Sequence, residues 1–344
     1  MAEKRTEIAS LGEFGLIDHL TRHNEVRNAS TLLSIGDDGA VIEPFGKQLV
    51  VTTDMLVEGV HFDLMYMSLK HLGYKSVIVN LSDIYAMNAE PSQITVSIAI
   101  SNRFSVEALD ELYEGINLAC DRYGVDLIGG DTTTSQKGLI ISITAIGEVE
   151  ENKFVTRSGA QENDLICVTG DLGAAYMGLL LLEREKKLYL ENPNVKPDLE
   201  NQTYILERFM KPEARRQTIA WLKEKKILPT AMIDISDGLS SEMLHICKQS
   251  EMGCLIYEEK LPIHDDTRAI AEKFGIAATT AALNGGEDYE LLFTISANEY
   301  EKVKECELFK IIGHITTADK GKYFLTNGNN KIELIAQGWN PIKN

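Results

Sequence analysis

Helix-like and strand-like segments alternate along the whole sequence, and this alternation limits the possible folds more than any other feature. The segment from Ser105 to Gly124 shows the helical pattern well, because Leu109, Leu112 and Ile116 fall on one helix face. Ser105 is a suitable N-cap for this helix, and Gly124 is a suitable C-terminal end. Alternating helices and strands predict a mixed α/β or α+β fold.

The same patterns predict further elements in both halves of the chain. Helices are expected at 68–88, 172–186, 212–226, 239–252 and 265–274, with Pro212 at a first helical position. Strands are expected at 48–53, 94–100, 139–146, 164–169, 231–235, 254–258, 289–295, 309–315 and 331–335. The polar segment Glu183–Gln202 contains two prolines and is predicted to be an exposed insertion or loop, whose role the sequence does not indicate.

Length and charge restrict the organisation and the partners. A chain of 344 residues is long for one core, so two domains are predicted, 1–149 and 150–344, with the charged run EVEENK at the boundary. Asp and Glu number 52 against 34 Lys and Arg, a net charge of -18. A surface this negative repels nucleic acid and anionic lipid, so we expect neither as a partner. It also repels ATP unless cations screen the binding site.

The sequence favours a cytoplasmic location. The N-terminal residues MAEKRTEIASLGEFG are charged and lack the apolar core of a secretory signal, and we find no stretch apolar enough to span a bilayer. The five cysteines are an odd number without a CxxC pair. We therefore expect reduced, mostly buried thiols in a reducing compartment.

Acidic residues recur in short segments rich in Gly, Ser, Thr or Asn, usually beside an apolar run. The six segments are 36–39, 52–54, 80–83, 129–133, 234–238 and 285–288. Each alone is an ordinary turn or helix cap. Together they are typical of Mg²⁺ sites around polyphosphates, because Mg²⁺ takes carboxylate oxygens together with water and phosphate. Such ions would also bridge an acidic protein and ATP, so metal-dependent phosphate chemistry is predicted, although no P-loop or kinase catalytic loop occurs.

The order of these segments resembles the thiamine-monophosphate kinases, members of the aminoimidazole-ribonucleotide-synthetase superfamily. The resemblance covers nearly the whole chain, through GDDGA, TTDMLVEGVHF, NLSDIYAMNAEP, GGDTTT, KPEAR, DISDGL, GGEDYELLF and the final Gly338-Trp339. It implies two α/β domains, with the N-terminal mixed sheet pairing across a homodimer. The N-terminal domain would bind Mg²⁺ and ATP, and the C-terminal domain would complete the active site.

The resemblance also implies roles for single residues. The Mg²⁺ ligands would be Asp37, Thr53, Asp54, Asp83, Asp131 and Asp234, with Thr52 and Asp237 assisting. ATP would contact Gly130, Asp131, Arg157 and Ser236, and Arg157 with Asp131 would act in catalysis. The thiamine phosphate would contact His61, Glu287 and Trp339. Without the resemblance, His61 reads as a core or edge histidine, Trp339 as a packing anchor and Arg157 as a surface ion-pair residue.

The implied reaction transfers a phosphoryl group directly from ATP to thiamine monophosphate, giving thiamine diphosphate, with several Mg²⁺ ions. The acceptor phosphate is already ionised at neutral pH, so no general base is needed. Two alternatives stay open: another ATP-dependent synthetase of the superfamily, as in purine synthesis, and a maturation factor that acts on a protein partner. The tail GWNPIKN lacks the cysteine expected for the hydrogenase-maturation branch. Selenophosphate synthetases use an N-terminal cysteine or selenocysteine, whereas no cysteine precedes Cys120 in this sequence.

Overall fold

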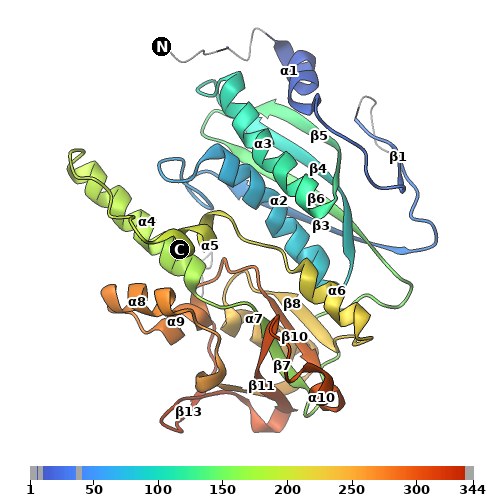
Figure 1. Cartoon of the computed structure of the whole chain (residues 1–344), viewed down its shortest axis with the longest axis vertical. Helices are drawn as coiled ribbons and strands as arrows, with labels where there is room; N and C mark the ends of the chain where they lie inside the picture. The colour runs from blue at the N-terminus through green and yellow to red at the C-terminus, as the bar shows by residue number, and fades with distance from the viewer. Residues whose placement is uncertain (1–5, 7–10, 36–40, 338–344) are drawn as a thin grey trace. The chain divides into compact units, whose positions relative to one another are not determined.

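The computed structural model describes residue 6 and residues 11–35 and 41–337, which form two compact units. Unit 1 comprises the chain up to Ile84 together with Ala89–Asn152, and unit 2 comprises Tyr85–Asn88 and the chain from Lys153 onward. Helices and strands alternate in both units (Figure 1). The mixed α/β class predicted from the sequence is confirmed, with one mixed sheet in each unit.

Unit 1 is built on a four-stranded sheet with the order β3-β6-β4-β5. All neighbours pair antiparallel except the parallel pair β4-β5. The strands are β3 (Gln48–Val57), β4 (Glu90–Ile100), β5 (Asp126–Thr134) and β6 (Ile140–Val149). Around the sheet lie α1 (Gly12–Thr21), α2 (Leu69–Ala86), α3 (Val106–Tyr123) and the short pair β1 (Thr31–Leu33) and β2 (Val41–Ile42).

Helices α2 and α3 lie side by side over the sheet (Figure 1), and two glycines allow their close approach. A Cβ atom on Gly73 of α2 would lie 2.0 Å from the carbonyl oxygen of Leu112. A Cβ atom on Gly115 of α3 would likewise lie 2.0 Å from the carbonyl oxygen of Lys70. Such contacts are sterically forbidden, so both positions require glycine and fix how the two helices cross.

The edge strand β3 presents apolar side chains to solvent. Val51 is 62% exposed, Met55 56% and Leu49 43%, and the three alternate with less exposed residues along the strand. This alternation is the period of a strand with one covered and one open face. Unit 1 therefore exposes an apolar stripe, Leu49, Val51 and Met55, on an edge strand.

Unit 2 contains a seven-stranded sheet with the order β13-β12-β9-β11-β7-β10-β8, in which only β12 and β9 are parallel. Its strands are β7 (Leu165–Thr169), β8 (Ala231–Asp234), β9 (Met252–Tyr257), β10 (Leu291–Ile295), β11 (Phe309–Thr317), β12 (Lys322–Leu325) and β13 (Lys331–Glu333). Its helices are α4 (Ala174–Glu191), α5 (Thr203–Met210), α6 (Arg216–Glu224), α7 (Leu239–Gln249), α8 (Asp265–Lys273), α9 (Ala278–Asn284) and α10 (Tyr300–Val303).

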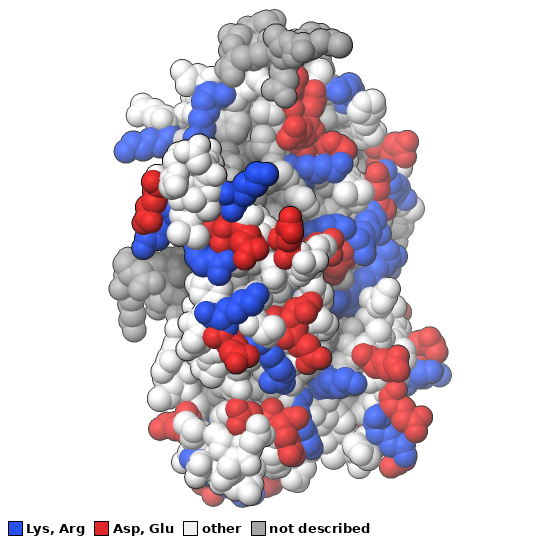
Figure 2. All heavy atoms as spheres, turned by 60° about the vertical axis from the view of Figure 1, so that its left-hand side comes forward, with Lys and Arg blue, Asp and Glu red and all other residues white. Residues whose placement is uncertain are grey.

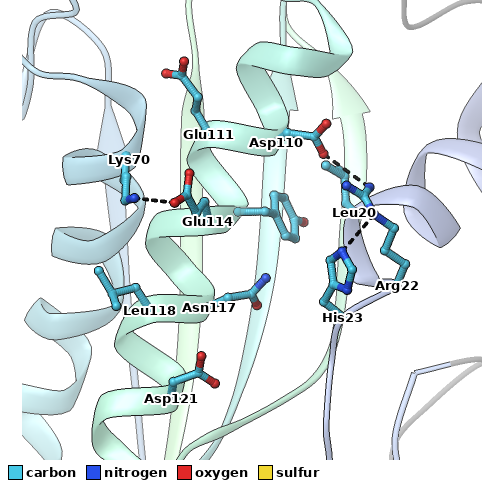
Figure 3. Close-up of a pocket in the computed structure, with 11 residues that line it drawn as sticks. Leu20, Arg22, His23, Lys70, Asp110, Glu111, Glu114, Asn117, Leu118 and Asp121 are labelled. Carbon is cyan, nitrogen blue, oxygen red and sulfur yellow. Dashed lines mark hydrogen bonds and ion pairs between the residues drawn. The ribbon is translucent and has the colours of Figure 1, made fainter.

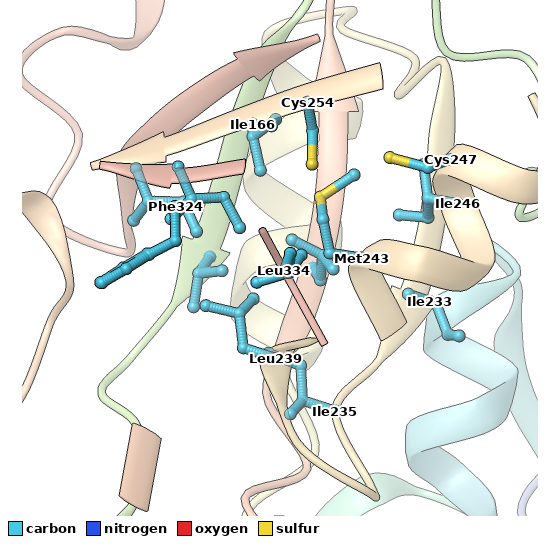
Figure 4. Packing of buried hydrophobic residues seen from close by; sticks show 14 of the residues in the cluster. Ile166, Ile233, Ile235, Leu239, Met243, Ile246, Cys247, Cys254, Phe324 and Leu334 are labelled. Carbon is cyan, nitrogen blue, oxygen red and sulfur yellow. The ribbon is translucent and has the colours of Figure 1, made fainter. Parts of the chain in front are cut away.

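The main core of unit 2 lies between α7 and the sheet. Leu239, Met243 and Ile246 of α7 point toward the strands and are fully buried (Figure 4). Full burial of such a side chain is worth about 1.5–3 kcal/mol. This packing fixes α7, and with it the turn that joins β8 to α7.

Several predicted boundaries differ from the structure. Residues 129–133, read as a turn, belong to β5, because pairing with β4 overrides the turn preference of Gly and Asp. Helix α6 begins at Arg216, so Pro212 lies outside it. Helix α4 continues to Glu191, so only the later part of the polar segment is irregular. Strand β12 and helices α5 and α9 have no counterpart among the predicted elements.

The surface of the protein carries charges of both signs (Figure 2). Lys and Arg side chains lie next to Asp and Glu over the face seen in Figure 2. No helix in the described part of the chain is both long enough and apolar enough to cross a membrane. All five cysteines are free thiols.

Candidate functional site

Three predicted metal ligands of unit 1 lie within regular elements. Asp54 is on β3, Asp83 is on α2 and Asp131 is on β5. Asp83 lies inside the helix predicted at 68–88, whereas the segments of Asp54 and Asp131, which read as turns, belong to strands because pairing with the neighbouring strands extends through them. The consequence is a more rigid placement of the carboxylates, since elements fix side chains better than loops do.

Side-chain hydrogen bonds connect β3 to α2 at these acids. The Thr52 hydroxyl donates to Oδ2 of Asp83 over 2.6 Å. The backbone N–H of Asp54 donates to Oδ1 of Asn80 over 3.0 Å. Asn80 and Asp83 are three residues apart on α2 and so share one helix face. The predicted ligands Thr52, Asp54 and Asp83 are thus brought together, whereas the Thr53 hydroxyl donates to the carbonyl oxygen of Ile143 over 3.1 Å.

The Gly130-Asp131 pair lies on β5, where the strand becomes exposed. Asp131 pairs with Ser97 of the parallel neighbour β4. A Cβ atom on Gly130 would lie 1.9 Å from the carbonyl oxygen of Val96, so a larger residue would displace the strand. Glycine therefore holds the backbone beside Asp131 close to β4.

His61 follows β3 in a short turn and is half-buried. Its Nδ1 accepts a hydrogen bond of 3.1 Å from the backbone N–H of Val57, and its own backbone N–H donates to the carbonyl oxygen of Val57 over 2.9 Å. The Nδ1 atom therefore carries no proton, which leaves Nε2 as the N–H donor of the neutral ring.

In unit 2 the predicted residues Asp234, Ser236 and Asp237 lie at the end of β8 and in the turn to α7. Asp234 is buried and Asp237 is exposed. The backbone N–H of Asp237 donates to Oε1 of Glu242 over 3.1 Å. A side chain in the first turn of α7 thus supports the turn that precedes the helix.

A second turn, Gly286–Glu290, lies against the first. The backbone N–H of Glu287 donates to the carbonyl oxygen of Ser236 over 2.7 Å, and that of Tyr289 donates to Ile235 over 2.9 Å. Glu287 and Tyr289 both have a positive φ, 62° and 51°. Such a backbone conformation costs on the order of 1–3 kcal/mol per non-glycine residue, so the surrounding structure must hold this turn in place.

The carboxylates of these two turns interact electrostatically. Although Asp237 keeps contact with solvent, partial desolvation by the surrounding atoms and the negative charge of Glu287 raise its pKa, while His245 opposes the shift. Burial raises the pKa of Glu242 to about 8. Its Oε2 atom is buried and has no hydrogen-bond partner among the described residues. Both carboxylates therefore lie where a bound cation would lower their free energy.

Arg157 is exposed in the loop that leads into β7, and its surroundings place it near α7. Its carbonyl oxygen accepts a hydrogen bond of 3.4 Å from the Ser250 hydroxyl. Burial and the positive charges of Arg157 and Lys248 lower the pKa of His245 on α7. Arg157 and Asp237 thus both lie close enough to His245 to affect its pKa.

Two of the predicted site residues are not among the residues that the structure describes. Asp37 and Trp339 lie outside the described residues. No group of three His, Cys, Asp or Glu side chains that could hold a metal ion occurs in the described ranges 11–35 and 41–337 or at residue 6. A bound Mg²⁺ would accordingly need phosphate and water oxygens in addition to carboxylates.

Unit 1 also has a cavity of about 480 Å³ between the end of α1 and the outward face of α3 (Figure 3). Arg22 approaches Asp110 within 3.4 Å, and Lys70 pairs with Glu114 across the opening. None of the predicted site residues lines this cavity. The cavity is therefore separate from the site predicted from the sequence.

Two supporting residues escaped the sequence reasoning. They are Asn80, which lies in the NLSD motif, and Glu242 on α7. A signal for Glu242 exists, because it lies beside Leu239, Met243 and Ile246 on the apolar face of a predicted helix. A buried acid requires a partner, so an acid on a buried helix face is a candidate functional residue.

Comparisons with known proteins identify the family of this chain. A family model described as "AIR synthase related protein, N-terminal domain" matches residues 36–149. A thiamine-monophosphate kinase of Bacillus subtilis (strain 168) is 35% identical over 339 residues, 97% of this chain and 100% of that protein. One from Pyrococcus abyssi (strain GE5 / Orsay) is 34% identical over 336 residues, 97% of each chain.

Solved structures show the same likeness. The thiamine-monophosphate kinase from Stenotrophomonas maltophilia K279a superimposes with a TM-score of 0.78 at 31% identity, covering 94% of this chain and 98% of that one. The structure "AaThiL complexed with AMPPCP and TMP" gives a TM-score of 0.73 at 31% identity, covering 97% and 98%. The E. coli hydrogenase maturation protein HypE gives 0.74 at 18% identity, covering 95% and 97%, and shares the fold alone.

Proposed function

Because the chain belongs to the thiamine-monophosphate kinase family, we propose that it transfers a phosphoryl group from ATP to thiamine monophosphate. The observation that carries the proposal is the full-length similarity to a kinase whose structure is described with AMPPCP and TMP. AMPPCP is an ATP analogue, so ATP is the proposed donor. The product is thiamine diphosphate, and the transfer is direct.

We propose Mg²⁺ as the metal, held by the carboxylates that each unit contributes. Asp54, Asp83 and Asp131 of unit 1 and Asp234 and Asp237 of unit 2 offer only oxygen donors, with Asp37, Thr52 and Thr53 completing the proposed set. Hard oxygen donors without sulfur suit Mg²⁺ rather than a softer metal. When bound, Mg²⁺ neutralises phosphate charge and so reduces repulsion between donor and acceptor.

The chain's own residues position the substrates. Gly130, Asp131, Arg157 and Ser236 are the proposed ATP contacts. The Arg157 guanidinium can donate to an equatorial oxygen of the transferred group and stabilise its negative charge. The acceptor phosphate needs no base because it is already ionised, and the barrier falls through alignment and electrostatic stabilisation.

His61, Glu287 and Trp339 are the proposed contacts for thiamine monophosphate. Thiamine has a cationic thiazolium and a flat aminopyrimidine ring, so a carboxylate and an aromatic face suit it. Glu287 supplies the negative charge and Trp339 the aromatic ring. His61, whose ring is held by the hydrogen bond from Val57 to Nδ1, is the proposed contact for the acceptor phosphate.

We also propose a homodimer formed through the sheet of unit 1 and a cytoplasmic location. The apolar stripe on β3 supports the dimer, because pairing with a second copy would bury both the stripe and the free strand edge. The five free cysteines support a reducing compartment. Residues 1–149 would then serve Mg²⁺, ATP and dimerisation, and residues 150–344 would complete the active site.

An acceptor panel tests the proposal. Purified protein is incubated with ATP, Mg²⁺ and thiamine monophosphate, or with other phosphate compounds including purine-pathway intermediates, and diphosphate products are measured. We expect thiamine diphosphate as the main product and no turnover in excess EDTA. An inert thiamine monophosphate beside a reactive purine intermediate would instead identify a synthetase of the same superfamily.

A further inference from the structure

A buried cluster of charges includes two residues of the Gly286–Glu290 turn. It consists of Glu290 and Asp288 from the turn, Arg208 from α5 and Arg215 from the loop before α6. Glu290 and Asp288 have exposed fractions of 0%. We call these four residues the Glu290 cluster.

Glu290 is the best connected member. Its Oε1 accepts from Nη2 of Arg208 over 2.8 Å and also from Nη2 of Arg215. Its Oε2 accepts from the Thr169 hydroxyl over 2.5 Å. A Cβ atom on Gly170 would lie 2.2 Å from Oε1, so the neighbouring chain leaves space for this carboxylate only.

Asp288 ties the same turn to another helix. Both of its oxygens accept from the backbone N–H of Gly173, over 3.1 and 2.9 Å, directly before α4 begins. Arg208 lies 4.0 Å from it. Arg208 contacts both Asp288 and Glu290, so the two side chains anchor the same side of the turn.

These anchors alternate with the two residues of positive φ. Glu287 and Tyr289 adopt a conformation that side chains disfavour, and such a conformation persists only where the surroundings hold it. Glu287 is the proposed contact for the thiamine phosphate. Its backbone N–H also supports Ser236, a proposed ATP contact. A single turn thus links residues for both substrates.

We propose that the Glu290 cluster positions Glu287 for the acceptor, so that Glu290, Arg208 and Arg215 are positioning residues for the phosphoryl transfer. This inference rests on the proposed function for its kinetic consequences. The physical basis is the attraction between buried opposite charges, which holds the strained turn in a conformation that it would otherwise leave. Loss of one guanidinium weakens this hold without altering any substrate contact.

Arg215→Gln is the suitable perturbation, because the side chain of Arg215 is 25% exposed and Arg208 still balances Glu290. We expect KM for thiamine monophosphate to rise about tenfold, with kcat changing less than about threefold. Arg268→Gln, which removes the same charge from an exposed position of α8, is the matched control and should leave both constants unchanged.

A double-mutant cycle separates positioning from general destabilisation. If Arg215 acts through Glu287, Arg215→Gln adds no further increase in KM to a Glu287→Gln variant. Multiplicative effects of the two substitutions would overturn the proposal. So would an Arg215→Gln enzyme whose KM equals that of the parent.

Hydrogen exchange provides a readout that needs no activity. The amides of Glu287 and Tyr289 donate to Ser236 and Ile235, so a loosened turn should exchange about tenfold faster in Arg215→Gln than in the parent. Amides of β9 and β11 should not change. Faster exchange throughout unit 2, or unchanged exchange at the turn, would overturn the inference. Failure of the parent to phosphorylate thiamine monophosphate would refute the proposed function alone, because the exchange result stands independently.

Discussion

Replacing Glu242 by Gln should stabilise the metal-free protein at alkaline pH. Glu242 is 2% exposed, and burial raises the pKa of its carboxyl from 4.5 to about 8. Between these pH values the unfolded chain releases a proton that the folded chain retains. The free energy of unfolding therefore falls as pH rises, and the loss is complete above about pH 8.

The magnitude follows from the two pKa values. At 1.36 kcal/mol per unit of pKa difference, ionisation of Glu242 lowers the free energy of unfolding by about 5 kcal/mol at pH 9. At pH 5 the loss is below about 1 kcal/mol, because the carboxyl is then largely protonated in the folded chain and partly protonated in the unfolded one. Gln has the shape of the protonated carboxyl and can still accept from the N–H of Asp237, so it removes the loss without removing that bond.

Urea unfolding in EDTA between pH 5 and pH 9 measures the effect. The Glu242→Gln variant should match the parent near pH 5 and exceed it increasingly toward pH 9. Glu272→Gln at an exposed position of α8 is the control for a change of one surface charge. Parallel stability curves for Glu242→Gln and the parent across the whole range would refute the reasoning, because they would mean that Glu242 ionises normally in the folded protein.

Two further predictions concern unit 1. Asp83→Asn removes one charge with little change in size, so the protein should fold while kcat falls by about 10²-fold, and raised Mg²⁺ should restore part of the lost kcat. Steady-state kinetics measure this effect, with Glu111→Gln as the control. Activity within a few-fold of the parent would exclude a ligand role for Asp83. Val51→Lys places a charge in the stripe on β3 and should convert a dimer to a monomer in light scattering, whereas an unchanged mass would exclude this face from the interface.

Local signals were sufficient for elements whose ends are marked in the sequence. Helix α3 begins after Ser105, whose side chain accepts from the N–H of Ala108, and ends at Gly124 in the left-handed conformation. Capping and periodicity act within a few residues, so both are visible without the fold. Strand β5 is the opposite case. Its sequence DLIGGDTTT resembles a turn, and only its pairing with β4, more than 20 residues away, makes it a strand.

The same distinction applies to the candidate site. The acidic segments were recognisable from the amino-acid sequence alone, because each places a carboxylate beside small residues within a few positions. The hydrogen bonds that hold these segments could not be predicted from the sequence. Asn80 accepts from the N–H of Asp54, and Glu242 from the N–H of Asp237, only once α2 and α7 are in place. Nor could the positive φ of Glu287 be predicted, since Gly286 beside it is the expected left-handed residue and adopts a φ of 72°, while no sequence signal marks Glu287 for the same conformation.

The electrostatics of unit 2 link stability to cation binding. Asp237 and Glu242 both have raised pKa values, so the metal-free fold holds negative charge at a cost in free energy. A cation bound at this turn would remove that cost and would favour the folded state by mass action. In the Glu290 cluster burial also raises the pKa of Asp288, to about 7, but Arg208 and Arg215 supply positive charge from within the chain. The first group of carboxylates is therefore suited to recruit a cation and the second to hold a backbone, although both lie around one short turn.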